Sequence, residues 1–230
     1  MFKCFVFFSF LIFFSFKAIA VSGVADKYEV TMKKVELCTS SACSSPTTVA
    51  SGSQAVNIAS LSAGAEAAAF GSTAGLPIGT TFTHMRVTLN RAFTIEGEVN
   101  VSGNNWCSTD SADAGSATAL HVGTLDTDGT ATDGTDQTLY LADADDYATD
   151  ETITISYGSP TYAVSMSVGS PSATEVQLIY ELGSSYTVGL VAPKIKVNFD
   201  VSTALGAGIA DTNKCYMWPE EPVVTISLTE

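Results

Sequence analysis

The sequence is poor in basic residues, and this scarcity excludes several classes of partner. The chain of 230 residues has 10 Lys and Arg against 24 Asp and Glu, and its formal net charge is −14. No Lys or Arg lies between Arg91 and Lys194. Nucleic acid and anionic lipid both require clustered Lys and Arg to neutralise phosphate, so we expect neither as a partner. The length is sufficient for a real hydrophobic core in one large domain or two small ones.

Enzyme motifs are also missing. The sequence has no Gly-x-Ser-x-Gly nucleophile elbow, no His-Glu-x-x-His zinc motif and no glycine-rich phosphate loop before a helix. Only His84 and His121 are available as histidine general bases. A carboxylate pair for glycoside hydrolysis is defined by its separation in space, so a secreted hydrolase stays open as an alternative, although the sequence selects no pair. We expect no catalytic activity.

Residues 1–20 have the pattern of a secretory signal peptide. Met1-Phe2-Lys3 carries positive charge, residues 4–16 form an apolar run, and Ala18-Ile19-Ala20 places small residues where signal peptidase cleaves. Cleavage after Ala25 is one alternative. An uncleaved anchor is less favoured, because the run is shorter than the roughly 20 residues of a spanning helix. We expect an exported protein, in the periplasm, on the cell surface or in the medium, with no transmembrane span after signal cleavage.

The cysteines of the mature chain predict two disulfides. Four remain after residue 20, namely Cys38, Cys43, Cys107 and Cys215, and an even number in an exported chain favours pairing. Four cysteines allow three pairings. Because Cys38 and Cys43 flank a short polar hairpin tip, we pair them with each other and join Cys107 to Cys215. A zinc site is the disfavoured alternative, since the short paired spacings of structural zinc sites are absent.

Alternation of apolar and polar residues dominates the mature chain and predicts an all-β fold. The expected strands are 28–37, 56–58, 81–89, a neighbour beginning at 93–95, 117–122, 138–141, 152–157, 162–168, 175–182, 186–191, 194–201 and 223–228. A change of parity predicts a β-bulge near Lys33-Lys34. Gly183-Ser184-Ser185 is expected to be a turn between strands. Residues 65–70 are the one candidate for a helical turn.

Strands that follow one another without amphipathic helices predict an antiparallel β-sandwich or barrel-like sheet with long acidic loops. We expect residues 21–230 to form a single domain, with a possible sub-boundary near 103–115. An outer-membrane barrel is disfavoured, because many outward positions are polar and the mature chain has only fourteen aromatic residues.

An acidic segment is the densest feature of the sequence. Its members are Asp126, Asp128, Asp133, Asp136, Asp143, Asp145, Asp146, Asp150 and Glu151, with Gly129 and Gly134 among them. Calcium takes six to eight hard oxygen ligands in flexible geometry, so Asp-rich turns are candidate calcium sites. The segment does not follow the helix-loop-helix calcium template, and a solvated acidic loop is the favoured alternative. If a cation binds, the predicted ligands are Asp126, Asp128, Asp133 and Asp136.

Four other residues are candidates for ligand binding. His84 and Arg86 share one face of a predicted strand, and Trp106 and Trp218 lie beside Cys107 and Cys215. We expect the long disulfide to bring the two tryptophans together, either as core or as a stacking platform for a surface glycan. His121, by contrast, is expected to be an exposed strand residue.

The order of features from Tyr28 to Gly97 resembles a known type of domain. A strand Val30-Thr31-Met32-Lys33-Lys34-Val35-Glu36-Leu37 is followed by a Cys-bounded hairpin, and Leu76-Pro77-Ile78-Gly79-Thr80-Thr81-Phe82-Thr83 leads into His84-Met85-Arg86-Val87. This resembles secreted or periplasmic β-sandwich domains of unknown function in bacteria, which are similar to prealbumin-like sandwiches. The resemblance covers residues 28–97, about a third of the chain. It implies export and a cell-envelope setting, and it implies no activity.

These features together predict an exported, acidic β-sandwich protein that acts by binding or by surface assembly. An apolar terminal strand, 223–228, can complete its own sheet or pair with the edge of a neighbouring molecule. Self-completion is the default expectation, and an assembly subunit should leave an unpaired edge at its first or last strand. The alternative is a calcium-dependent carbohydrate-binding or adhesive module.

Overall fold

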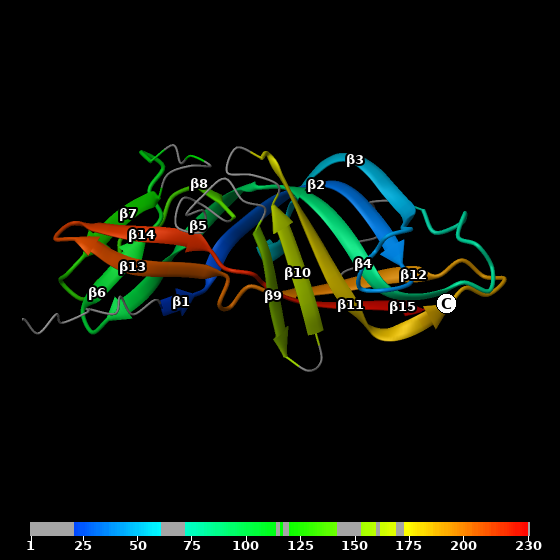
Figure 1. The fold of residues 1–230 in the computed structure, drawn as a ribbon. Helices are drawn as coiled ribbons and strands as arrows, with labels where there is room; N and C mark the ends of the chain where they lie inside the picture. Colours follow the sequence, from blue (N-terminus) through cyan, green and yellow to red (C-terminus); the bar gives the residue numbers. More distant parts are fainter. Residues whose placement is uncertain are drawn as a thin grey trace, which may run out of the picture.

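The structure is a computed structural model that describes residues 21–60, 72–113, 116, 120–141, 153–159, 162–168 and 173–229. These residues form an all-β, antiparallel fold with one short 3-10 helix, η1 (Ile58–Ser60), and no α-helix (Figure 1). The strands are β1 (Val21–Gly23), β2 (Ala25–Cys38), β3 (Thr47–Asn57), β4 (Thr81–Asn90), β5 (Ala92–Ser102), β6 (Asn105–Ser108), β7 (His121–Asp126), β8 (Gln137–Tyr140), β9 (Ile153–Ser159), β10 (Tyr162–Val168), β11 (Glu175–Thr187), β12 (Lys194–Asp200), β13 (Leu205–Asp211), β14 (Lys214–Pro219) and β15 (Val223–Thr229). The predicted all-β class is confirmed. The predicted helical turn at 65–70 lies outside the described residues.

β4 and β5 form one extended path along the molecule rather than two neighbouring strands. Both run antiparallel to β2, β4 along its second half and β5 along its first half. The reason is an unbroken alternation of buried positions, namely Met85, Val87, Leu89, Arg91, Phe93, Ile95, Gly97, Val99 and Val101. Asn90-Arg91-Ala92 contains neither Gly nor Pro, and the chain bends at Arg91 without reversing its direction. The expectation that residues 93–95 begin a neighbouring strand is therefore wrong.

The predicted bulge in the first long strand is confirmed. The register of β2 against β3, and against β4, shifts between Met32 and Lys34. An extra residue in a strand inverts the side-chain parity that follows it. This inversion lets Val30 before the bulge and Val35 after it both point into the core.

The paired strands form one open path in the order β1-β13-β14-β7-β6-β5-β2-β4-β11-β10-β9, with β3 added on β2 and β8 added on β5. Strands β12 and β15 form a separate two-stranded sheet that lies against β11. Figure 1 shows an elongated molecule in which β2, β4 and β5 connect two ends. We call the end with β1, β6, β7, β13 and β14 lobe A, and the end with β3, β4, β11, β12 and β15 lobe B.

The second half of the chain differs from the expected strand pattern in three places. The segment Gly183-Ser184-Ser185 is not a turn between strands, because β11 continues through it with a register shift between Glu181 and Tyr186. Strands β6, β13 and β14 are not predicted by the alternation of the sequence. The third place is the range 103–115, which contains β6, a strand hydrogen-bonded to β5 and to β7 in one sheet. The single domain with a possible sub-boundary in this range stays a prediction.

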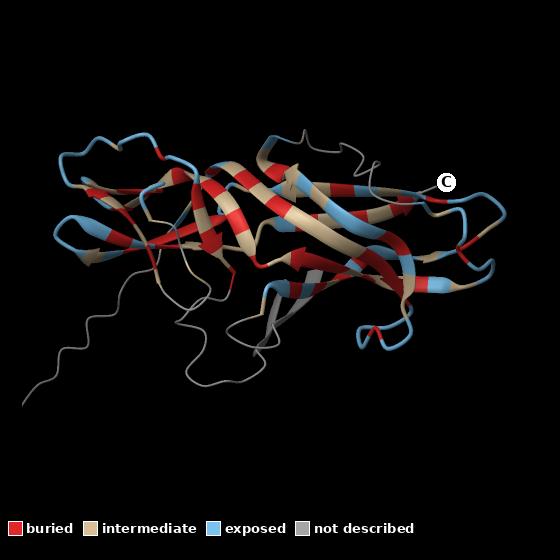
Figure 2. Ribbon diagram, turned by 90° about the horizontal axis from the view of Figure 1, so that it is seen from above, coloured by how far each residue is buried: buried red, intermediate tan, exposed pale blue. Residues whose placement is uncertain are grey.

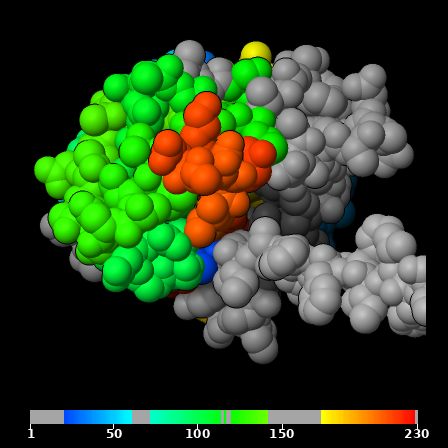
Figure 3. All heavy atoms as spheres, turned by 90° about the vertical axis from the view of Figure 1, so that its left-hand side faces the viewer, coloured from blue at the N-terminus to red at the C-terminus, as the bar shows by residue number. Residues whose placement is uncertain are grey.

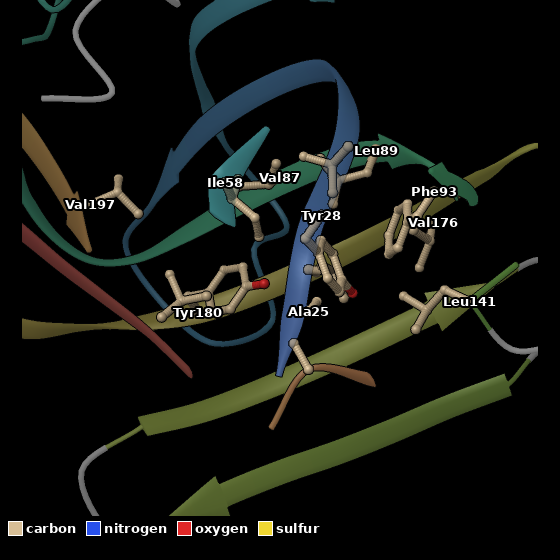
Figure 4. Close-up of a cluster of buried hydrophobic side chains, with 14 of the residues drawn as sticks. Ala25, Tyr28, Ile58, Val87, Leu89, Phe93, Leu141, Val176, Tyr180 and Val197 are labelled. Carbon is tan, nitrogen blue, oxygen red and sulfur yellow. The ribbon is translucent and has the colours of Figure 1, made fainter. Parts of the chain in front are cut away.

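Tyr28 lies in a single cluster of buried apolar side chains that extends through both lobes. Figure 4 shows Tyr28 beside Phe93, and their ring centroids are 5.6 Å apart in a tilted arrangement. Alternating burial along the strands is visible as red and tan bands in Figure 2. The core therefore joins the long central strands to the strands that cover them.

Both predicted disulfides are present. Cys38 is bonded to Cys43 and Cys107 to Cys215, with Cα–Cα distances of 5.0 and 5.9 Å. The long bridge joins β6 to β14 across β7 next to Gly123. A Cβ atom on this residue would collide with the Ser108 carbonyl and the Met217 side chain, so only glycine fits there.

Candidate functional site

Arg86, a predicted binding residue, forms an ion pair inside lobe B. Its Nε donates to Glu36 Oε2 at 2.8 Å, and Lys34 Nζ lies 2.6 Å from the other carboxylate oxygen. The pairing of β2 with β4 sets Glu36 directly opposite Arg86. The Glu36 side chain is only 2% exposed. Burial would raise the pKa of this carboxyl, but the bonds from Lys34 and Arg86 outweigh it and hold the pKa below 4.5.

The small disulfide loop closes over this ion pair, since Arg86 Nη1 also donates to the Cys43 carbonyl at 3.5 Å. His84 lies on the same face of β4, opposite Cys38 on β2 and Glu181 on β11. Its Nδ1 is hydrogen-bonded to the Thr83 hydroxyl at 2.8 Å. The sequence correctly places His84 and Arg86 on one face. Ligand binding by either residue stays a prediction.

His121 is fully buried, so the expectation of an exposed residue is wrong. It shares its parity with Gly123 and Leu125, which also face inward along β7. The backbone N–H of Tyr140 donates to His121 Nε2 at 3.2 Å, and the two rings stack with centroids 5.8 Å apart. The buried guanidinium of Arg91 lies over the Tyr140 ring, and its Cζ is 5.8 Å from the ring centroid. This stack was missed because Arg91 and His121 are polar residues at inward positions.

The predicted calcium ligands occupy separate places in the acidic loop. Asp126 Oδ2 accepts the Thr132 N–H at 2.8 Å, and Asp128 Oδ1 accepts the Thr130 N–H at 2.9 Å. Asp136 forms a 2.7 Å ion pair with Lys27. Within the ranges that the structure describes, no three His, Cys, Asp or Glu side chains form a group that could hold a metal ion.

Asp133 is exposed, and its negative charge acts on Glu98. The pKa of Glu98 is raised by burial first, and then by the negative charges of Asp26, Asp133 and Glu96. The remaining acidic residues, Asp143, Asp145, Asp146, Asp150 and Glu151, lie outside the described residues. Calcium binding stays a prediction.

The two tryptophans do not come together, contrary to expectation. Trp106 is opposite Asp126 at one end of β7, whereas Met217, next to Trp218, is opposite His121 at the other end. Five residues of strand at about 3.3 Å each separate these register positions by about 17 Å. β6 and β14 both run antiparallel to β7, so the residue before Cys107 and the residues after Cys215 point to opposite ends.

Trp218 instead covers the glycines of the adjacent strand. Gly206 is its register partner on β13, and a Cβ atom there would collide with the indole ring. The ring extends over Gly208 as well. The indole N–H donates to Glu220 Oε1 at 2.7 Å. These contacts give Trp218 a role in the fold. A glycan platform of both tryptophans is not supported by this arrangement.

A protonatable carboxyl lies where the chain passes from lobe A to lobe B. The segment between β14 and β15 contains Glu220, whose carbonyl accepts the Tyr28 hydroxyl at 2.9 Å, and then Glu221. Burial raises the pKa of Glu221 to about 7, and a hydrogen bond with Tyr180 opposes this rise. The pKa of Tyr180 is raised by its own burial and by the charge of Glu221. Sequence reasoning missed this group, because Pro219 and Pro222 on either side indicate an exposed turn.

The sheet path ends in two strands that have a partner on one side only among the described strands. β1 is paired with β13 through three residues, and β9 is paired with β10 through seven. The first strand, β1, is thus an edge among the described strands. The last strand, β15, pairs along its full length with β12 of the same chain and on that side only. A role in assembly stays a prediction.

β9 is the longer of these two free edges. Its sequence, Ile153-Thr154-Ile155-Ser156-Tyr157-Gly158-Ser159, has no charged residue and no proline. Natural edge strands are commonly protected by charge, proline or bulges. Two other edges carry such protection: β12 has Lys194, Lys196 and Asp200, and the β2–β3 pair has two register shifts. The outer edge of β15 has neither charge nor proline, but β15 lies against β11. In Figure 1, β9 lies beside β10 on the side away from β11.

Comparison of the chain with protein-family models, with curated proteins and with solved structures finds no match. The resemblance of residues 28–97 to prealbumin-like sandwiches therefore stays a prediction. Within the described ranges, no helix has the length and apolar character needed to span a membrane.

Proposed function

We propose that the protein is an exported, non-catalytic assembly subunit whose copies associate through the edge of β9. The observation that supports this proposal is the open end of the sheet path at β9, a seven-residue strand without charge or proline. An unpaired row of backbone N–H and C=O groups is a template for another strand. The two disulfides are typical of a protein that folds in an oxidising compartment.

The expected contact joins two molecules, because the open edge of β9 can pair with only one other strand. Cross-strand side-chain pairs contribute about 0.2 to 1 kcal/mol each, and β9 offers seven positions. Association also costs translational and rotational entropy, so the contact should form only at high protein concentration. Such a contact suits a crowded surface, where copies are held close together.

The test compares a blocked edge with a matched change on a central strand. Thr154→Lys with Ser156→Lys places two charges on β9. Gln177→Lys with Ser185→Lys places the same charges on β11, which is paired with β10 on one side and β4 on the other. Light scattering of the mature chain should show monomers in dilute solution and dimers at high concentration. The β9 variant should remain monomeric while the β11 variant still assembles. A wild-type chain that stays monomeric at the highest soluble concentration would contradict the proposal.

A further inference from the structure

Two loops form the far end of lobe B. Residues 72–80 precede β4 and residues 188–193 follow β11, and they are held together by backbone bonds. Gly79 N–H donates to the Val188 carbonyl at 2.8 Å, and Val188 N–H donates to the Thr80 carbonyl at 2.9 Å. The Thr73 hydroxyl donates to the Pro193 carbonyl at 2.5 Å. Figure 1 shows the two loops, teal and orange, beyond the strand ends near the marked C-terminus.

These loops present large aliphatic side chains to solvent. Leu190 is 92% exposed, Ile78 is 68% exposed and Val191 is 58% exposed. We call these three residues the apolar tip. They are three of the seven large apolar side chains that are exposed in the described part of the chain. In Figure 2 the loops are the pale blue extremity on the side of the C-terminus.

The two loops that carry the apolar tip contain no charged residue. None occurs in 72–83 or in 182–193, nor in 37–60, which includes the disulfide loop beside the start of β4. The first charged residue after the second loop is Lys194, at the start of β12. In a chain with a net charge of −14, the side chains of these two loops can thus leave water without the desolvation of an ion among them.

We propose that the apolar tip inserts into the interfacial region of a zwitterionic lipid bilayer. The net negative charge of the chain opposes an anionic surface, whereas a phosphocholine surface carries no net charge. A second copy of the chain is a poorer occupant, because three side chains are far fewer than the about 20 residues a side of a stable protein interface.

The binding test uses sedimentation of the mature protein with lipid vesicles. Vesicles of phosphatidylcholine alone are compared with vesicles that also contain phosphatidylglycerol. The tip variant is Leu190→Ser with Ile78→Ser, and both side chains are so exposed that folding should not depend on them. The control is Ile209→Ser, an exposed isoleucine on β13 at the opposite end, where Figure 3 shows the β13–β14 hairpin in orange.

The mature chain should sediment with phosphatidylcholine vesicles, and added phosphatidylglycerol should weaken its binding. The tip variant should lose at least about tenfold in partitioning, because each buried aliphatic group contributes substantially to transfer from water. The Ile209 variant should bind within about twofold of the wild type.

Three results would overturn the proposal: absence of binding to phosphatidylcholine, unchanged binding of the tip variant, or binding only to anionic vesicles. A further result would also be decisive: the wild type binds no vesicles, and the tip variant no longer self-associates in the absence of lipid. The tip is then a contact between copies, and the lipid proposal is wrong. The Thr154→Lys, Ser156→Lys variant distinguishes lipid binding from association through β9. It has an unchanged apolar tip, so it should bind vesicles as the wild type does.

Discussion

Replacing Glu221 with Gln tests how the junction between the two lobes depends on pH. In the folded chain, burial raises the pKa of this carboxyl from its ordinary value of 4.5 to about 7. The folded state therefore holds a proton that the unfolded chain releases between these two pH values. Stability should be unaffected by Glu221 below about pH 4.5, fall as the pH rises through this window, and be lowest above about pH 7.

The size of the effect follows from the same pKa values. At about 1.4 kcal/mol per pH unit, a rise from 4.5 to about 7 corresponds to about 3 kcal/mol. Glutamine has the shape of the neutral acid and cannot lose a proton, and its amide oxygen can still accept the Tyr180 hydroxyl. Glu221→Gln should therefore raise the free energy of unfolding by about 3 kcal/mol near pH 8 and by almost nothing near pH 4.

Urea unfolding of both proteins at several pH values measures this difference. Glu220→Gln is the matched control, since it removes an equal charge one residue away, and any gain common to both variants comes from net charge. A stability difference between wild type and Glu221→Gln that is the same at pH 4 and pH 8 would refute the reasoning.

Three further changes test other parts of the structure. Cys107→Ser, made together with the same change at its partner, should lower the free energy of unfolding by about 2 to 5 kcal/mol, measured by urea unfolding under non-reducing conditions. Arg86→Met leaves the carboxylate of Glu36 buried with only one cation and should cost about 3 kcal/mol or more by thermal unfolding. Asp126→Asn with Asp128→Asn should leave the melting temperature in chelator nearly unchanged. If calcium binds, wild type should melt higher on its addition and this variant should not.

Each of these experiments has its own contradicting result. Equal stability of the wild type and the Cys107 variant would exclude a stabilising role for the long bridge. If Arg86→Met does not lower the melting temperature, Lys34 and water satisfy Glu36 without the guanidinium. Arg86→Lys is the conservative comparison for this variant. A wild-type melting temperature that calcium does not alter would end the calcium prediction.

The sequence predicted the features that depend on local spacing and parity. A six-residue span with a polar tip favoured a bond between Cys38 and Cys43, and this choice left one partner for Cys107. The parity change at Lys33 likewise predicted an extra residue in the strand. The apolar side chains before and after Lys33 can face the same core only if a β-bulge lies between them. Both features could be predicted because they follow from residues that are close in sequence, and the structure confirms both.

The features that the sequence did not predict depend on contacts between distant segments. β13 contains the run Leu205-Gly206-Ala207-Gly208, which has no strand preference by itself. Gly206 is needed because the indole of Trp218 occupies the space of a side chain there. Arg91 has an inward position because Tyr140, far along the chain, lies beneath its guanidinium. Neither contact is visible until the strands are paired.

Amide hydrogen exchange along β9 tests the central claim of edge association most directly. The exchange rates of residues 153–159 are measured by mass spectrometry in dilute and in concentrated solutions of the mature protein. If copies pair through this edge, these amides should exchange markedly more slowly at high concentration, while those of β15 change little. Identical exchange of β9 at both concentrations, in samples that light scattering shows to be oligomeric, would contradict the account.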